Sequence, residues 1–174
     1  MPGSHWMVVL SPENFEITRE AGFTIQGFKS KHRKKAERMA PGDRLLFYVT
    51  GWMVFPATAT IVGTCIEDHT PIWHETGSFA DDYPYRVPIE PAVVLEASEY
   101  IDARQIAHRM LYVKRWAPED WPLAFLGNLH LLSTADFKLI EGEMQKLVSR
   151  RRSWRGAVGN GAVALSSHPL DRPA

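Results

Sequence analysis

The sequence predicts an α+β fold: a small mixed or antiparallel β-barrel surrounded by short helices, with a longer C-terminal helix. Short apolar runs typical of strands outnumber helical segments, and the helical segments fall at turns or near the end of the chain. Strands and helices do not alternate regularly, so a parallel doubly wound sheet is not expected. The 174 residues, 45% of them hydrophobic, suffice for one domain with a substantial core.

The first strands are separated by short helices. The apolar, β-branched run His5–Ser11 predicts a buried strand. A short helix follows it, because Ser11 is a favourable N-cap and Pro12 suits the first helical position. Residues 31–39 have the composition of a helix of about two turns and end at a Pro-Gly-Asp turn. The next strand is predicted at Asp43–Gly51.

The middle of the chain is expected to be mostly strand and loop. Small and apolar residues alternate in Phe55–Asp68, which predicts a closely packed strand of the barrel wall. Residues 69–82 are polar and predict a long loop. Prolines interrupt the following apolar run, 83–96, and favour an edge strand or a sharply bent one.

The last part of the chain contains the clearest helix. Residues 102–110 predict a short helix, 116–128 an aromatic loop and 129–133 a final strand. Ser133 or Thr134 is then the expected N-cap of a longer helix. Its apolar residues recur at helical spacing: Phe137, Ile140, Met144 and Leu147.

The composition predicts a domain over residues 1–150 and a tail over 151–174. The tail begins with arginines and continues with Gly, Ala and Pro, a composition that favours a flexible chain. No stretch reaches the ~20 apolar residues of a membrane span, and no charged-then-apolar leader is present, so we expect a cytoplasmic protein that does not contact membranes. The single cysteine, Cys65, excludes a disulfide within the chain and a cysteine-rich zinc site.

Signatures of catalysis are missing. The sequence contains no G-x-S-x-G motif, no Walker-type phosphate loop and no dinucleotide fingerprint. His69 and His74 lie near Glu75, but Pro71 prevents a helix and H-E-x-x-H is not formed, so a solvated loop is favoured over a metal site. We therefore predict a non-enzymatic protein without a metal or cofactor.

One local feature stands out from a balanced overall charge. Lys and Arg number 20 and Asp and Glu also number 20, yet residues 29–38 contain six cationic side chains and one acid, Glu37. Such a segment is either a solvated surface or a phosphate-binding edge, and its neighbours in the fold decide between them.

Three stretches together resemble a known family. They are "HWMVVLSPENF", "MAPGDRLLFYVTG" with the following "FPATATIVG", and "YPYRV". This order of motifs is similar to the EVE domain family of the PUA-like superfamily, a structural relative of YTH domains. The resemblance extends over about residues 6–144.

The resemblance implies a PUA-like β-barrel whose pocket accepts one extruded nucleobase, often a modified one such as a methylated cytosine or adenine. DNA or RNA with a modified base is then the expected partner, together with a separately encoded effector protein. The alternative is a small-molecule sensor that holds a free nucleobase or nucleoside in the same cavity. An enzyme acting through His69 and His74 ranks last.

The motifs and the physics of base recognition give a set of candidate residues. A flipped base needs aromatic stacking partners and polar groups facing its edge. The candidate pocket residues are Trp6, Ser11, Asn14, Phe28, Tyr48, Tyr83, Pro84, Tyr85 and Trp116. The candidate phosphate-binding residues are Lys29, Lys31, Arg33, Lys34, Lys35 and Arg86. Alternative roles remain for several of them: Trp6 as a barrel plug, Ser11 and Asn14 as a helix cap, and Arg86 in a structural ion pair.

The arginine-rich stretch "SRRRSWR", residues 149–155, resembles the first basic segment in composition. In a nucleic-acid-binding protein it would add a second contact that does not depend on sequence. The alternative is again a solvated surface.

Overall fold

The computed structural model describes residues 3–75 and 80–164. The strands in these residues are β1 (His5–Leu10), β2 (Ile25–Phe28), β3 (Arg44–Val49), β4 (Val54–Phe55), β5 (Ala57–Ile61), β6 (Ile66–Glu67), β7 (Tyr85–Val94), β8 (Ile101–Asp102) and β9 (Leu129–Leu132). The α-helices are α1 (Pro12–Glu20), α2 (Arg33–Glu37), α3 (Ala103–Ile106) and α4 (Thr134–Ala164). Short 3-10 segments lie at Ser30–His32, Ala97–Glu99, Ala107–Arg109 and Pro118–Phe125.

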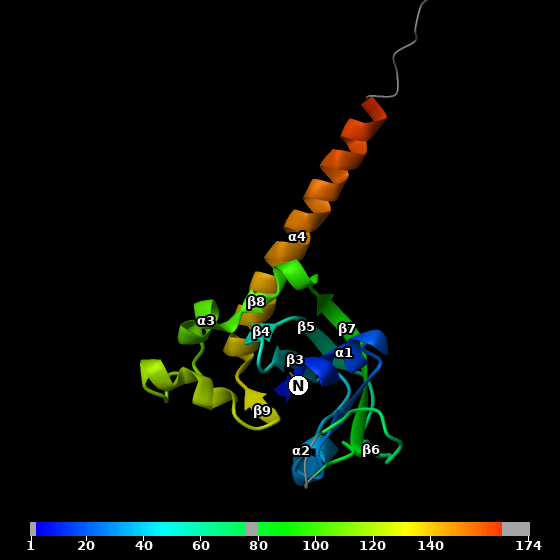
Figure 1. The fold of residues 1–174 in the computed structure, drawn as a ribbon, viewed down its shortest axis with the longest axis vertical. Helices are drawn as coiled ribbons and strands as arrows, with labels where there is room; N and C mark the ends of the chain where they lie inside the picture. Colours follow the sequence, from blue (N-terminus) through cyan, green and yellow to red (C-terminus); the bar gives the residue numbers. More distant parts are fainter. Residues whose placement is uncertain (1–2, 76–79, 165–174) are drawn as a thin grey trace, which may run out of the picture.

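The strands form one mixed, curled sheet, which confirms the predicted fold class. Its main path runs β2-β7-β5-β3-β1-β9, with the short strands β4, β6 and β8 paired at its sides. β1 and β3 are parallel, whereas the other neighbours are antiparallel. The curvature gives a half-barrel with helices on both sides (Figure 1).

Both faces of the central strands are buried. Along β3, Leu45, Phe47 and Val49 belong to one apolar cluster, which also contains Phe15 of α1. Leu46 and Tyr48 belong to a second cluster, formed with α3 and the start of α4. Side chains of a strand alternate between its two faces, so a strand that is apolar at every position is expected where both faces are covered.

The proline-containing strand β7 lies inside the sheet and not at its edge. Residues 85–88 pair with β2, and residues 89–94 pair with β5. Pro88 lies where the pairing changes, and Pro91 lies at a register shift opposite Thr58 and Ala59. At these positions a missing N–H removes little from the ladder. The edge position that the sequence favours is therefore wrong, and the prolines lie where the pairing changes or shifts register.

The C-terminal helix is longer than expected. Ser133 caps it, since its Oγ accepts a hydrogen bond from the Asp136 backbone N–H at 3.1 Å. The helix has 31 residues and continues to Ala164. The sequence, by contrast, predicts that a flexible tail begins at residue 151. Arg151 and Arg155 lie one helical turn apart and both bind Glu96, at 2.9 and 2.7 Å, which holds this turn against the body.

Beyond that contact α4 projects away from the body (Figure 1). The rest of the predicted tail, residues 165–174, lies outside the described residues. Across the part of the chain that the structure describes, no helix combines the length and apolar character needed to cross a bilayer.

Candidate functional site

A cavity of about 350 Å³ lies at the end of β1, where the chain enters α1. Val9, Ser11, Glu13 and Asn14 contribute one side of it. Pockets of ~300–1,000 Å³ are typical of small-molecule sites. The local sequence produces this geometry: β1 ends at Leu10, and Ser11 caps a helix that Pro12 begins.

Asn14 connects α1 to the loop between β6 and β7. Its side chain is 2% exposed, and its Nδ2 donates to the His74 carbonyl at 2.8 Å while its Oδ1 accepts from the His74 N–H at 2.8 Å. The amide is therefore engaged with the backbone of the loop, and Asn14 positions the cavity wall. Ser11 Oγ accepts from the Asn14 N–H at 3.2 Å, which leaves the hydroxyl proton of Ser11 available.

Tyr83 also lines the cavity, next to Asn14 of α1. The Tyr83 hydroxyl lies 3.4 Å from Asn14 Nδ2, and the centres of the Tyr83 and Trp73 rings are 6.1 Å apart. Burial, with a smaller contribution from the charge of Glu75, raises the pKa of Tyr83 to about 12. The hydroxyl is consequently a neutral donor and acceptor at physiological pH.

A charged pair lies in the same cavity. Lys29, directly after β2, forms an ion pair with Glu75, and its Nζ lies 5.8 Å from the centre of the Tyr83 ring. The second carboxylate oxygen of Glu75 accepts from the Asp81 N–H at 3.3 Å. The pair supplies both a hydrogen-bond donor and an acceptor to a molecule in the cavity. It also turns Lys29, predicted as a phosphate ligand, toward the cavity.

The remaining wall comes from the turn before β9. Phe125, Leu126, Gly127 and Asn128 line the cavity, and Thr50 after β3 completes it. Gly127 has φ +90°, a conformation that glycine adopts readily, and the turn is fixed because the Val9 N–H donates to the Asn128 carbonyl at 2.9 Å. Sequence reasoning did not select these residues. The Leu-Gly-Asn turn signal between an aromatic loop and a strand was the available indication.

Several predicted pocket residues lie in the interior instead. Trp6 is 2% exposed and does not line the cavity; its indole N–H donates to Asp43 Oδ2 at 3.0 Å. Phe28 and Tyr85 belong to the same apolar cluster as Trp6. Tyr48 faces the opposite cluster and stacks on Phe125 with 4.6 Å between ring centres. All four are strand residues, and the sheet turns their side chains into the core.

Two further pocket predictions lie near the cavity but do not line it. Pro84 is buried beside Tyr83. Trp116 is 42% exposed and lines a neighbouring groove that shares Leu126 with the cavity. Of the nine predicted pocket residues, Ser11, Asn14 and Tyr83 are the ones that the structure brings together at the cavity.

Arg86 is a structural residue. It is 0% exposed, so its guanidinium is not at the surface, where the predicted phosphate contact would lie. Its guanidinium donates to the carbonyls of Tyr83, at 3.1 Å, and of Asp82 and Thr70, and it lies over the Trp73 ring. These contacts hold the loop between β6 and β7 in the shape that brings Tyr83 to the cavity.

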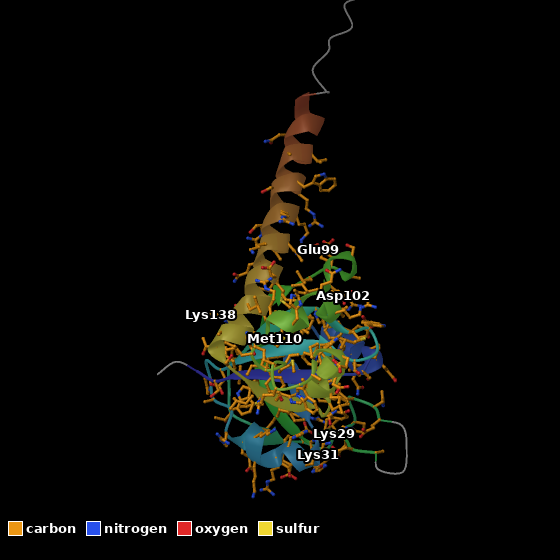
Figure 2. The ribbon with its side chains drawn as sticks, turned by 90° about the vertical axis from the view of Figure 1, so that its left-hand side faces the viewer. Lys29, Lys31, Glu99, Asp102, Met110 and Lys138 are labelled. Carbon is orange, nitrogen blue, oxygen red and sulfur yellow. The ribbon has the colours of Figure 1, made fainter. Side chains whose placement is uncertain are left out.

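The basic segment at residues 29–38 begins at the cavity, which Lys29 lines. Its cations fall into two groups. Three of them bind partners within the protein. Lys29 pairs with Glu75, Arg33 pairs with Glu37 at 2.7 Å, and Lys35 donates to the Leu129 carbonyl at 3.1 Å. Lys31, Lys34 and Arg38 are exposed and have no ion pair within residues 3–75 and 80–164. Figure 2 shows Lys29 and Lys31 at the end of the body away from α4.

The second basic segment has different neighbours. Arg151 and Arg155 bind Glu96, and Arg151 also approaches Glu99 at 3.4 Å. This segment is the part of α4 from which the helix leaves the body, at the opposite end of the body from α2 (Figure 1). Its paired arginines serve to attach the helix.

The histidines considered for metal binding are not brought together. His69 is exposed and bonds Asp82 at 2.6 Å and Glu67 at 3.0 Å, and these two carboxylates raise its pKa. His74 lies at the cavity, where its backbone binds Asn14. In the described residues no group of three His, Cys, Asp or Glu side chains has the arrangement of a metal site.

Comparisons with known proteins agree with the fold and the motifs. The chain is 26% identical to UPF0310 proteins of Pyrococcus horikoshii and Pyrococcus abyssi over 148 and 149 residues, which is 79% of this chain and 97% of each relative. Its fold is similar to that of the YTH domain of mmi1 in an RNA complex, with a TM-score of 0.60, 10% identity and coverage of 86% of this chain and 87% of the other.

A second YTH structure, that of Zygosaccharomyces rouxii MRB1 in complex with N6-methyladenosine RNA, gives a TM-score of 0.57 at 18% identity, with 83% of this chain and 89% of the other covered. The family model named EVE domain matches residues 4–116. This match includes β1, α1, the basic segment and the loop that carries Tyr83, and it extends over more than half of the sequence. The chain therefore belongs to the EVE domain family.

Proposed function

We propose that this domain binds one nucleobase, extruded from DNA or RNA, and that a modification such as a methyl group on cytosine or adenine favours its binding. The observation that carries the proposal is the cavity itself: polar side chains line it, and one of them, Lys29, is the first cation of the basic segment. The similarity to a YTH domain determined with N6-methyladenosine RNA supports the same reading of the fold.

The cavity contains the groups that base recognition needs. Tyr83 and Phe125 line the cavity with the edges of rings that are 5% and 4% exposed, and contact of a base with an aromatic side chain is worth up to ~1–3 kcal/mol. The Ser11 hydroxyl, the Glu75 carboxylate and the Lys29 ammonium present donors and acceptors to the edge of the base. A methyl group on the base would be favoured by the exposed side chain of Leu126.

The exposed cations of the basic segment account for the rest of the ligand in this proposal. Lys31, Lys34 and Arg38 hold the flanking phosphates in this proposal, and each phosphate contact releases counterions and adds about 0.9 to the salt dependence of binding. The domain recognises the base without chemistry or a cofactor, and a separately encoded effector protein acts on the result.

A small-molecule sensor is the second candidate. Half of the cations of the basic segment are engaged within the protein, and one of them, Lys29, faces the cavity in an ion pair. This arrangement suits a free nucleobase or nucleoside, which has no flanking phosphates to bind.

Fluorescence anisotropy on matched short probes tests the proposal. The probes are DNA with and without 5-methylcytosine or 5-hydroxymethylcytosine, and RNA with and without N6-methyladenosine, each at two salt concentrations. Lys31→Gln/Lys34→Gln is compared with Arg150→Gln/Arg152→Gln, which removes the same charge from α4. We expect only the first pair to weaken binding, equally for modified and plain probes, and to lower the salt slope by up to about 0.9 per residue.

The outcomes separate the two candidates. A preference for one modified probe that persists at the higher salt supports a base-reading cavity. Binding to all probes alike, lost at the higher salt, contradicts it. Absence of binding to every probe, combined with thermal stabilisation by free nucleosides, replaces it with the small-molecule sensor.

A further inference from the structure

A second hollow adjoins the cavity. This groove, of about 340 Å³, is lined by side chains that include Tyr112, Arg115, Trp116, Leu126 and His130. Leu126 also lines the cavity, so the two hollows are separated by one residue. A polymer whose base occupies the cavity therefore has a continuous path into the groove.

The groove exposes apolar and aromatic surface on a fixed backbone. Trp116 is 42% exposed, and Leu123 and Leu126 are 41% and 66% exposed. The backbone N–H of Trp116 donates to the Val113 carbonyl at 2.9 Å. Tyr112 is held at both ends, because its backbone N–H donates to Asp136 Oδ2 at 2.8 Å and its hydroxyl bonds His130 Nδ1 at 2.6 Å. The aromatic surface is thus arranged before any ligand binds.

The charge of the groove is positive. The Arg115 guanidinium carbon lies 5.6 Å from the centre of the Tyr112 ring, and Arg115 has no ion pair in the described part of the chain. Lys35 donates to the Leu129 carbonyl, next to His130. Burial, and then the charge of Lys35, lower the pKa of His130, and its Nε2 is buried without a hydrogen-bond partner among the described residues. The residues that line the groove include no acid.

Exposed aromatic rings combined with cations are the combination by which proteins bind single strands. We propose that the groove binds the nucleotide next to the base in the cavity, with its base stacked on Trp116 and its phosphate at Arg115. This inference rests on the proposed function and specifies its substrate class. The neighbouring nucleotide must be unpaired to stack, so the substrate is a single strand or a locally opened one.

Trp116→Ala tests the groove against the cavity. The matched control is Trp52→Ala, since Trp52 is also 42% exposed, stacks on Tyr100 at 6.4 Å and lines neither hollow. The probes are free 5-methyldeoxycytidine and N6-methyladenosine, and single-stranded pentamers with the same modified base at the centre. Calorimetry measures the affinity for each, and thermal unfolding checks that each variant is folded.

We expect Trp116→Ala to weaken pentamer binding roughly 5- to 150-fold and to leave nucleoside binding unchanged. Trp52→Ala should leave both unchanged. Arg115→Gln should lower the salt slope of binding to the single-stranded pentamers by about 0.7.

Equal pentamer affinities for Trp116→Ala and the unaltered protein would overturn the proposal that the groove binds a nucleotide. The proposal for the cavity would still stand if the modified base is preferred. Equal affinities of the unaltered protein for single-stranded and fully paired probes would also overturn it. If the unaltered protein prefers no modified nucleoside or pentamer, the proposed function fails and the groove inference fails with it.

Discussion

The cavity wall and the interior of the half-barrel contain the same kinds of residue in different roles. At the wall, the polar atoms of Ser11, Tyr83 and Lys29 contact protein neighbours, and the same side chains border an open space. In the interior, the polar atoms of Trp6 and Arg86 are also bound to protein partners, but these side chains do not line the cavity. The difference predicts that a ligand in the cavity contacts the wall residues and does not reach Trp6 or Arg86. It predicts that interior variants change stability and that wall variants change binding.

The largest expected effect is that of Trp6→Ala. The substitution leaves a cavity in the core and removes the hydrogen bond to Asp43, so it should destabilise the protein by ~3–5 kcal/mol. Urea unfolding measures this loss. Trp6→Phe, which keeps most of the packing and loses the N–H, should cost ~1–3 kcal/mol and is the variant to use if Trp6→Ala does not fold. Full stability combined with loss of base preference would move Trp6 back to the binding site.

Arg86→Met comes next. Methionine fills part of the space of the arginine but makes none of its bonds to the carbonyls of Thr70, Asp82 and Tyr83. We expect a loss of ~1.5–3 kcal/mol in unfolding free energy and faster proteolysis between β6 and β7. Arg104→Met is the control, because Arg104 is exposed and its ion pair is with its neighbour Asp102. Unchanged proteolysis in Arg86→Met would mean that the loop is held by other contacts.

The mixture of correct and incorrect assignments has a physical cause. Local chemistry identified the elements that depend on local signals: the Ser11 cap of α1 and the Ser133 cap of α4. The orientation of a side chain on a strand is not local. Residues 45–49 carry large apolar or aromatic side chains at every position, so their sequence does not distinguish the two faces, and Phe47 and Tyr48 are buried in different clusters.

The site was identified in part for the same reason. Ser11 and Asn14 follow from the helix start, and Tyr83 from the Tyr-Pro-Tyr-Arg motif. Glu75 and the turn at 125–128 are distant in sequence and come together only through tertiary contacts. The length of α4 was underestimated because glycines after Arg155 lower helix propensity, whereas Glu96, 55 residues before Arg151, holds the helix.

Tyr83→Phe tests the wall with a smaller change. It removes one hydroxyl, whose nearest described partner is Asn14 at 3.4 Å, so unfolding free energy should change little. Affinity for the preferred modified probe should fall by ~0.5–1.5 kcal/mol if the hydroxyl bonds the base. Because the pKa of Tyr83 is raised to about 12, its titration should not alter affinity between pH 6 and about 9. Unchanged affinity with lowered stability would assign Tyr83 to the interior group.

His32 tests where the interior of the half-barrel ends. Its contribution to stability depends on pH only below about pH 6.5. It lies in the basic segment, and burial, followed by the charges of Lys35 and Lys31, lowers its pKa from 6.5 to about 4. The unfolded chain therefore binds this proton at a higher pH than the folded chain. The protonation of His32 therefore lowers the free energy of unfolding as the pH decreases from about 6.5 to about 4. Below about pH 4 this histidine contributes no further change.

His32→Gln removes this dependence without adding a charge. The difference in urea midpoint between the two proteins should be constant above pH 6.5 and should shift in favour of the variant as the pH is lowered to about 4. His5 and His130, whose pKa values burial also lowers, are present in both proteins, so the comparison isolates His32. A difference that does not vary with pH would mean that His32 titrates at its ordinary pKa, exposed to solvent like Lys31 and Lys34, and that the interior ends before residue 32.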